Sequence, residues 1–300
     1  MRNIQVIAHR GASEDAPEHT LAAYTKAIED GADALECDVR LTADGHLVCV
    51  HDRRVNRTSN GRGAVSALEL ADLATLDFGS WKDSEESPDW RDAGLTSVLT
   101  LERLLELVAD AGRPVQLAIE TKHPTRWAGQ VEERLLHLLK RFGLDSPGAG
   151  TEARGAGTEA RGAGTEARGA GTEAGAGAAW AGAGEAWPGG SAVRIMSFSA
   201  RSLHRIAAAA PELPIVYLMQ FVSPRLRDGR LPAGARIAGP GMRIVRNHPG
   251  YIARLHRAGH RVHVWTVNEP EDVELCVQLG VDAIITNRPK QVLSQLGRPS

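Results

Sequence analysis

The stretch GADALECDVRLTADGHLVCVHD, residues 31–52, decides the fold because it holds two apolar strand-like runs only four residues apart. Residues 42–45 are too few for a crossover helix, and Asp-Gly between alternating apolar runs predicts a β-hairpin. With a two-residue Asp-Gly turn, Asp38 faces His51 across the hairpin, whereas a three-residue turn shifts the register by one. Glu36 shares a strand face with Asp38, because side chains repeat every second residue. The hairpin therefore gathers two carboxylates and an imidazole.

Outside this hairpin, apolar runs alternate with segments of helical period. Strands are expected at 4–8, 33–38, 47–50, 115–120, 193–198, 214–219, 236–238, 262–267 and 282–286. Helices are expected at 20–31, 99–112, 129–143, 199–210, 248–259 and 269–280, several of which end in glycine. Such alternation predicts an α/β fold with a parallel sheet and helices outside, and its length favours a closed (β/α)8 barrel in one domain, 1–300.

One segment departs from this pattern. The heptapeptide GAGTEAR occupies 148–154, 155–161 and 162–168, and a Gly/Ala-rich tail follows it. A coiled coil would need apolar residues at two positions of each heptad, and this repeat offers only alanine. We therefore predict that residues 148–190 are a disordered, low-complexity insertion in a surface loop. Without them, the chain has the usual length of one barrel, roughly 250 residues.

Composition limits the function. Lys and Arg number 35 against 37 Asp and Glu, so no overall charge favours nucleic acid or a membrane surface. Cys37, Cys49 and Cys276 have no CxxC spacing, which indicates buried thiols in a reducing compartment. The N-terminus lacks the pattern of a secretory signal, and no run approaches ~20 apolar residues. These features predict a cytoplasmic protein without nucleic-acid partners or stable membrane insertion.

Polar residues follow the predicted strands at their carboxyl ends, where barrels of this class carry their catalytic groups. Three of them, Glu36, Asp38 and Glu120, form an all-oxygen set that suits Mg²⁺ or Ca²⁺. Zinc is disfavoured because the side chain of Cys37 points to the opposite face from Glu36 and Asp38. The sequence therefore predicts a site for a hard divalent cation.

The other strand-end groups complete a phosphodiester site. Arg10 and Lys122 form an anion-binding pair, since arginine offers a bidentate fork and lysine a point charge. His9 and His51 titrate near neutral pH and suit a general base and a general acid. A cation, two basic side chains and two histidines match the needs of in-line displacement at a phosphodiester.

Several stretches together resemble the glycerophosphodiester phosphodiesterase family in order and spacing. They are AHRGASEDAPEHTLAAY, the hairpin quoted above, RVNRTSNGRG, LAIETK, VHVWTVN and DAIITNRP. The resemblance covers essentially the whole chain outside 148–190. It implies a TIM (β/α)8 barrel and metal-dependent hydrolysis of glycerophosphodiesters to sn-glycerol 3-phosphate and an alcohol.

The same resemblance assigns roles to individual residues. It implies that His9 and His51 are catalytic, that Glu36, Asp38 and Glu120 bind the metal, and that Arg10 and Lys122 bind phosphate. Glu18, Phe198 and Trp265 are candidate substrate-binding residues, although a strand-end tryptophan such as Trp265 equally suits core packing. The small insertion of the family corresponds to residues 54–95.

The chain also departs from the family pattern in two places. His19 stands where Asn is common, for which we expect a modest effect on the loop. Asn287 stands where Asp is frequent, a position that either packs the bottom of the barrel or borders the site.

Two other functions stay open. A lysophospholipase D-like phosphodiesterase would act on membrane-derived diesters and would need an exposed apolar rim, which Leu76, Phe78, Trp81 and Trp90 could provide or which could simply pack the insertion. A non-catalytic phosphodiester-binding barrel would lack one of the seven site residues, and all seven are present. The sequence leaves open the head group, the choice between Mg²⁺ and Ca²⁺, the oligomeric state and which histidine is the acid.

Overall fold

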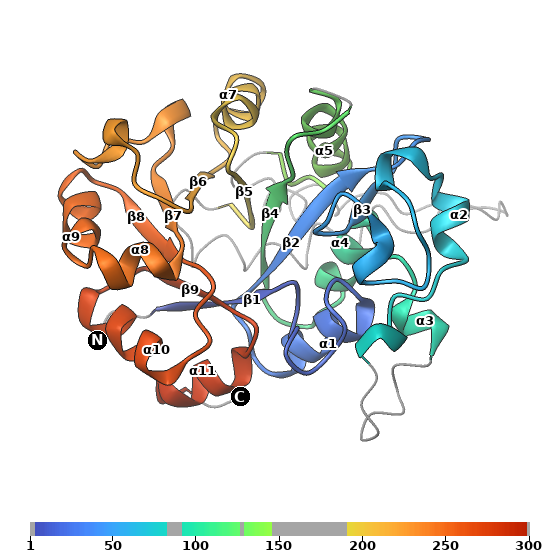
Figure 1. Ribbon diagram of the computed structural model, residues 1–300, viewed down its shortest axis with the longest axis horizontal. Coiled ribbons are helices and arrows are strands. Elements are labelled where there is room, and N and C mark those ends of the chain that lie inside the picture. Colours follow the sequence, from blue (N-terminus) through green and yellow to red (C-terminus); the bar gives the residue numbers. More distant parts are fainter. Residues whose placement is uncertain (1–3, 83–91, 127–128, 146–190, 299–300) are drawn as a thin grey trace, which may run out of the picture.

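The computed structural model describes residues 4–82, 92–126, 129–145 and 191–298 as a closed parallel barrel (Figure 1). The described strands form one sheet in the order β1-β9-β8-β7-β6-β5-β4-β2-β3, and β1 also pairs with β2, which closes the ring. The barrel strands are β1 (Gln5–His9), β2 (Ala34–Leu41), β4 (Gln116–Thr121), β5 (Val193–Ser197), β6 (Ile215–Met219), β7 (Ile237–Pro240), β8 (Arg261–Val264) and β9 (Ala283–Thr286). The predicted TIM barrel is confirmed.

Helices surround the barrel, and each predicted helix is present. They are α1 (Leu21–Glu29), α4 (Leu101–Ala109), α5 (Gln130–Arg141), α7 (Ala200–Ala209), α9 (Gly250–Arg257) and α10 (Pro270–Leu279). Four short helices were not predicted: α2 (Leu70–Ala74), α3 (Ala93–Thr96), α8 (Met242–Asn247) and α11 (Pro289–Gln295). All four have seven residues or fewer, too short to show a clear helical period in the sequence.

The hairpin forms as predicted, but its register differs by one residue. Strand β3 (Leu47–Cys49) pairs antiparallel with β2, with Leu41 opposite Leu47 and Val39 opposite Cys49. Thr42 N–H donates to the carbonyl of His46 at 3.0 Å, so the turn has three residues and ends at Gly45, whose φ is +87°. Such loops place glycine in the left-handed region. The prediction that Asp38 faces His51 is therefore wrong, and Val50 N–H donates to the carbonyl of Asp38 instead.

The barrel interior is layered because alternate side chains of every strand point inward. An apolar layer lies mid-barrel and includes Ile7, Ala118, Met196, Leu218 and Ile285. Two positions beyond these residues lie His9, Glu120, Phe198, Gln220 and Asn287, and Lys122 lies two positions beyond Glu120. Because every second residue points inward, these polar and aromatic side chains lie at the carboxyl-terminal mouth of the barrel.

Gly11 explains why the first strand can end where it does. Its φ is +84°, and a Cβ placed on it would lie 2.6 Å from the backbone of Ala23 in α1. Only glycine allows this approach of loop and helix. The preceding Arg10 also has a positive φ of 58°, and its backbone N–H donates to the Glu36 carboxylate at 3.0 Å. Strand β1 therefore leaves the barrel through a tight turn that fixes Arg10.

The segment after the hairpin packs beside the barrel around its own apolar cluster. Val48, Val50, Val55, Leu73 and Phe78 are buried there. The predicted insertion 54–95 is described over 54–82 and 92–95, and the predicted low-complexity segment 148–190 lies outside the described residues. Within the described parts, no helix is both long and apolar enough to cross a bilayer. All three cysteines are buried and free.

Candidate active site

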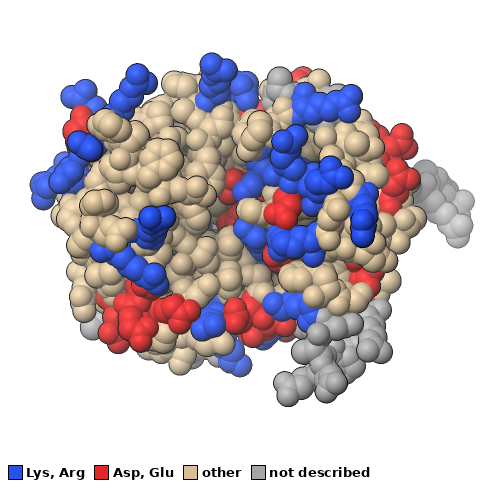
Figure 2. Space-filling view, viewed as in Figure 1, with Lys and Arg blue, Asp and Glu red and all other residues tan. Residues whose placement is uncertain are grey.

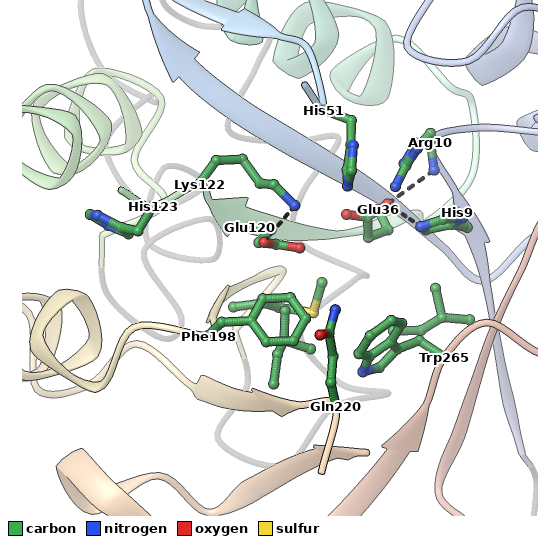
Figure 3. Close-up of a pocket in the computed structure, with 13 residues that line it drawn as sticks. His9, Arg10, Glu36, His51, Glu120, Lys122, His123, Phe198, Gln220 and Trp265 are labelled. Carbon is green, nitrogen blue, oxygen red and sulfur yellow. Dashed lines mark hydrogen bonds and ion pairs between the residues drawn. The ribbon is translucent and has the colours of Figure 1, made fainter. Parts of the chain in front are cut away.

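A pocket of about 950 Å³, its open mouth included, lies at the carboxyl ends of the barrel strands. Figure 3 shows two unlike sides: His51, Arg10, His9, Glu36, Glu120 and Lys122 lie along one, and Phe198, Gln220 and Trp265 lie along the other. The pocket thus brings together eight of the ten predicted site residues. The remaining two, Asp38 and Glu18, do not line it but contact residues that do.

The register between neighbouring strands determines which side chains lie together on the polar side of the pocket. His9 pairs with Glu36 between β1 and β2, and Asp38 pairs with Glu120 between β2 and β4. Neighbouring strands are about 4.8 Å apart, so the side chains of each pair lie side by side, and the two pairs follow each other along the inward face of β2. Lys122 follows Glu120 on the same face.

Burial keeps the imidazole of His9 neutral. Desolvation, together with the charge of Arg10, lowers the pKa of His9 to about 3. Its Nδ1 lies 2.7 Å from Oδ1 of Asn287, and because an amide oxygen only accepts, Nδ1 carries the proton. The Nε2 atom, 4.0 Å from the Glu36 carboxylate, is left able to accept a proton. The alternative in which Asn287 packs the barrel bottom is excluded, because it lies in the site.

His51 has a different environment. Its Nδ1 lies 2.7 Å from Oδ1 of Asp52, so Nε2 is the nitrogen available to the pocket (Figure 3). Burial lowers the pKa of His51, and the hydrogen bond with Asp52 opposes that shift. The hydrogen bond from Arg57, followed by that from His51, lowers the pKa of Asp52 to about 2 despite partial burial. Asp52 is therefore ionised at neutral pH and stabilises a protonated His51.

The three predicted metal ligands meet in space. Glu36, Asp38 and Glu120 are buried, and each offers an oxygen within 4.8 Å of the others. Burial and the charge of Asp38 raise the pKa of Glu36 well above its usual value and that of Glu120 to about 8. A divalent cation would favour the ionised forms of both groups, and all-oxygen donors match Mg²⁺ and Ca²⁺. The residues therefore fit a hard divalent cation.

Asp38 is the most deeply placed of the three, with 1% of its surface exposed. Its carboxylate lies 3.0 Å from Nε of Arg10, 2.9 Å from Nε2 of His19 and 3.2 Å from Nζ of Lys122. Burial alone would raise the pKa of Asp38, but Lys122, His19 and Arg10 hold it well below its usual value. Asp38 thus stays ionised and fixes the two predicted phosphate-binding cations relative to each other.

His19, where the family pattern has Asn, supports Asp38 from behind. Burial lowers the pKa of His19, so the neutral ring donates Nε2–H to Asp38. Its Nδ1 lies 2.8 Å from the hydroxyl of Tyr24, and that hydroxyl donates to the carbonyl of Glu36 at 3.0 Å. His19 therefore connects helix α1 with the strand that carries two of the carboxylates.

Glu18 forms an ion pair with Arg10. Its carboxylate lies 3.0 Å from Nη1 of Arg10 and accepts two hydrogen bonds from Arg57, at 2.8 and 2.7 Å. Burial would raise the pKa of Glu18, but Arg57 and Arg10 hold it at about 2. Because Arg57 also binds Asp52, one chain of ion pairs joins the Arg10 and His51 ends of the site.

Two aromatic rings dominate the opposite side of the pocket. The rings of Phe198 and Trp265 meet edge to face, with centroids 5.4 Å apart and planes at 88°. The indole N–H of Trp265 donates to the carbonyl of Gly239 at 2.7 Å, which fixes the ring at the mouth. Phe198 stays 36% exposed. Trp265 therefore lines the pocket and is not buried in the core.

Sequence reasoning missed three residues that contact or line this site: Asp52, His123 and Gln220. Gln220 lies two positions beyond the inward-facing Leu218, so strand parity could have identified it, and Asp52 is the direct neighbour of His51. His123 lines the pocket while its Nε2 lies 3.2 Å from the buried Glu132 of α5. That contact between distant segments has no local signal.

Comparison with known proteins identifies the family. The chain matches the model of the glycerophosphoryl diester phosphodiesterase family over residues 9–145 and 185–291. The chain belongs to this family. A Mycobacterium tuberculosis relative, "Probable glycerophosphodiester phosphodiesterase 1", is 41% identical over 287 residues, which cover 95% of this chain and 89% of the relative. The Bacillus subtilis glycerophosphodiester phosphodiesterase is 31% identical, covering 95% and 84%. The chain is thus an enzyme of the glycerophosphodiester phosphodiesterase class.

Solved structures share the barrel. An Oleispira antarctica phosphodiesterase in complex with the product sn-glycerol-3-phosphate has a TM-score of 0.70 at 22% identity, with 98% and 96% of the two chains covered. A Galdieria sulphuraria glycerophosphodiester phosphodiesterase, assigned as putative, gives 0.71 at 19% identity and 99% coverage of both chains. At these identities, the likeness supports the fold.

The contact between His19 and Asp38 generates a prediction about cation binding. We expect His19→Leu, which removes the donor to Asp38, to weaken Mn²⁺ binding about tenfold or more, as loss of an outer-shell partner of a metal ligand does. His19→Gln keeps an N–H donor and should lose much less. Both replacements meet the same backbone φ of +60°, so their difference isolates the donor. Mn²⁺ titration followed by electron paramagnetic resonance measures the affinity, and equal affinities in the two variants would contradict the assignment.

Proposed function

We propose that the protein hydrolyses glycerophosphodiesters to sn-glycerol 3-phosphate and an alcohol, in a reaction that requires a divalent cation and proton transfer by His9 and His51. The observation that carries this proposal is a single pocket with cations, carboxylates and two imidazoles on one side and an aromatic wall on the other. The family membership and the sn-glycerol-3-phosphate bound to the Oleispira antarctica protein support it.

The two sides of the pocket suggest how a substrate lies. The phosphate binds beside Arg10 and Lys122, whose positive charges are held near the pocket by Asp38. Arginine and lysine are the usual partners of phosphate oxygens. The glycerol carbon chain lies against Trp265 and Phe198, which offer apolar surface at the mouth. The alcohol moiety then lies on the side of His51.

The histidines differ in the way that acid–base catalysis requires. The neutral His9 accepts a proton at Nε2 from the attacking hydroxyl, either a water or a substrate hydroxyl. His51, supported by the ionised Asp52, donates a proton from Nε2 to the leaving alkoxide. Two titratable groups whose surroundings differ in this way commonly divide the acid and base roles.

Glu36, Asp38 and Glu120 would hold the divalent cation, since they form the acidic cluster of the site. When bound, such a cation supplies positive charge that stabilises the phosphorane-like transition state and acidifies a hydroxyl ligand. Lys122 lies 2.8 Å from Glu120 and 3.2 Å from Asp38, so it tethers the carboxylates to the phosphate site.

A lysophospholipase D-like activity is the alternative, and it depends on an apolar rim. Phe78 is buried and Leu76 packs against the same cluster, while Trp81 is 39% exposed and Trp90 lies outside the described residues. Phe221, at 73% exposure, lies just after β6. Two of the four positions expected to form the rim, Leu76 and Phe78, thus pack the insertion, which favours the water-soluble substrates.

Release of sn-glycerol 3-phosphate tests the function. We expect the purified protein to release it from glycerophosphocholine and glycerophosphoethanolamine, EDTA to abolish release, and added Mg²⁺ or Ca²⁺ to restore it. His51→Ala should lower kcat about a hundredfold or more, the usual contribution of a positioned acid. His204→Ala, an exposed histidine on α7, is the matched control and should keep wild-type activity.

Release that persists in EDTA would contradict the cation requirement. Absence of release with either metal supplied would contradict the glycerophosphodiesterase activity on these substrates. Cleavage of lysophosphatidylcholine but of neither water-soluble diester would favour the lysophospholipase D-like alternative.

Asp52 gives a prediction about pH dependence. Burial lowers the pKa of His51 and the hydrogen bond with the carboxylate of Asp52 opposes that shift, so we expect Asp52→Asn to lower the pKa further. A general acid acts in its protonated form, so its activity is lost as pH rises through its pKa. We therefore expect the alkaline limb of the kcat/KM profile to move to lower pH in Asp52→Asn. The exposed Asp228→Asn should leave the profile unchanged. A shift of the acidic limb would instead make His51 the base and contradict the assignment.

A further inference from the structure

Residues 221–261 have a charge balance unlike that of the whole chain. They contain nine arginines, no lysine and one acidic residue, Asp228, whereas the complete chain has 35 Lys and Arg against 37 Asp and Glu. Each of the nine arginines is exposed. Positive charge is therefore concentrated on one part of a molecule whose net charge is only −2.

Most of this charge lies at the end of the barrel that carries the pocket. The loop with η6 (Pro224–Leu226) and helix α8 follow the carboxyl ends of β6 and β7. Arg254 of α9 donates from Nη1 to the carbonyl of Arg227 at 2.7 Å, so it lies against that loop. Figure 2 shows Lys and Arg side chains over this loop, α8 and α9, with acidic side chains gathered over α10 beside them. Three of the nine arginines lie at or near the opposite, amino-terminal ends of β7 and β8: Arg236, Arg257 and Arg261.

Ion pairs neutralise part of the charge at the pocket end. Arg230 pairs with Asp228 at 3.2 Å, and Arg246 pairs with Asp272 of α10. In the part of the chain that the structure describes, the remaining four arginines have no carboxylate oxygen within 4.0 Å. We call these four the basic surface: Arg225, Arg227, Arg243 and Arg254. Exposed cations that lie close together without acidic partners create a local field that attracts anions.

An exposed aromatic ring lies beside the basic surface. Phe221 is 73% exposed and directly follows Gln220, which lines the active-site pocket. The next residue, Val222, lines a separate cleft together with Arg227 and Arg254. The backbone N–H just before α8 donates to the carbonyl at the end of β6 at 2.9 Å, so α8 begins beside the strand that leads to Phe221. Arginines around an exposed phenylalanine are the combination that binds at a lipid–water interface.

We propose that the basic surface binds a membrane that contains anionic lipids, with Phe221 placed among the head groups and the mouth of the pocket turned toward the membrane. The negative potential of such a membrane attracts basic residues over about one Debye length, roughly 10 Å. The attachment is peripheral, since it uses surface charges and one ring. It concerns where the protein binds and requires no lipid in the active site, so it stands apart from the proposed function.

Nucleic acid is the other large polyanion that a basic surface could bind. Proteins that bind single strands place several aromatic side chains along the surface, on which successive bases stack. Within residues 221–261, all of which the structure describes, Phe221 is the one exposed Phe, Tyr or Trp side chain. One ring among arginines therefore favours the membrane.

Flotation of the full-length protein with lipid vesicles tests the proposal. We expect binding to vesicles of phosphatidylglycerol and phosphatidylcholine in equal parts, little binding to phosphatidylcholine alone, and release by added salt. The triple variant Arg225→Gln/Arg227→Gln/Arg254→Gln should lose about a hundredfold in affinity, because each basic residue near an anionic surface contributes about fivefold. Phe221→Ser keeps every charge and should lose about tenfold, as expected for a ring that no longer leaves water.

The matched control is Arg236→Gln/Arg257→Gln/Arg261→Gln, which removes the same number of exposed charges from the same segment at the other end of the barrel. It should bind the anionic vesicles like the wild type, and thermal unfolding should confirm that all variants are folded. Equal losses in the two triple variants, equal binding to both kinds of vesicle, or no binding to either would overturn the proposal. Binding of an oligonucleotide but not of anionic vesicles, lost only in the first triple variant, would assign the surface to nucleic acid instead.

Discussion

The buried carboxylate of Asp38 is the constraint on which the site depends. An ionised group with 1% exposure is costly unless it is paired, and Arg10, His19 and Lys122 pair it at 3.0, 2.9 and 3.2 Å. These three partners come from the loop after β1 and from the end of β4. One charge therefore ties together segments that are more than a hundred residues apart, and it orients Arg10 and Lys122, the two proposed phosphate-binding cations.

Around this centre the barrel separates two kinds of surface. The register of β1, β2 and β4 brings the acids and bases together on one side of the pocket, while Phe198 and Trp265, directly after β5 and β8, lie on the other side. Burial and the charge of Asp38 raise the pKa values of Glu36 and Glu120, and the nearby cations do not fully oppose this shift. A divalent cation would lower both pKa values. The pocket thus has a charged side and an aromatic side, which is the arrangement that the proposed substrate orientation uses.

Ion pairs outside the pocket connect the residues that line it. Glu18 joins Arg10 to Arg57, and Arg57 joins Asp52, which holds His51. Exposed ion pairs contribute little on their own, but here Glu18 is partly buried and the geometry with Arg57 is bidentate. The chain of contacts holds the His51 side of the site in a fixed position relative to Arg10.

Much of this could be predicted from the sequence, because the strand period is local. Apolar alternation identified all nine strands, and polar residues at their ends identified the groups that meet in the pocket. Long-range contacts could not be predicted in the same way. The hairpin register depends on a three-residue turn that sequence does not distinguish from a two-residue one, and the contacts of His19 and Asn287 depend on how distant loops pack.

Binding of sn-glycerol 3-phosphate to Asp38→Asn tests the central role of Asp38 most directly. Isothermal titration in EDTA compares wild type and variant without metal, and thermal unfolding confirms that both are folded. Removing a negative charge should by itself tighten anion binding. Because Asp38 positions Arg10 and Lys122, we predict the opposite, a loss of about tenfold in affinity, as for a lost charged hydrogen bond. Tighter or unchanged binding in a folded Asp38→Asn variant would contradict the account.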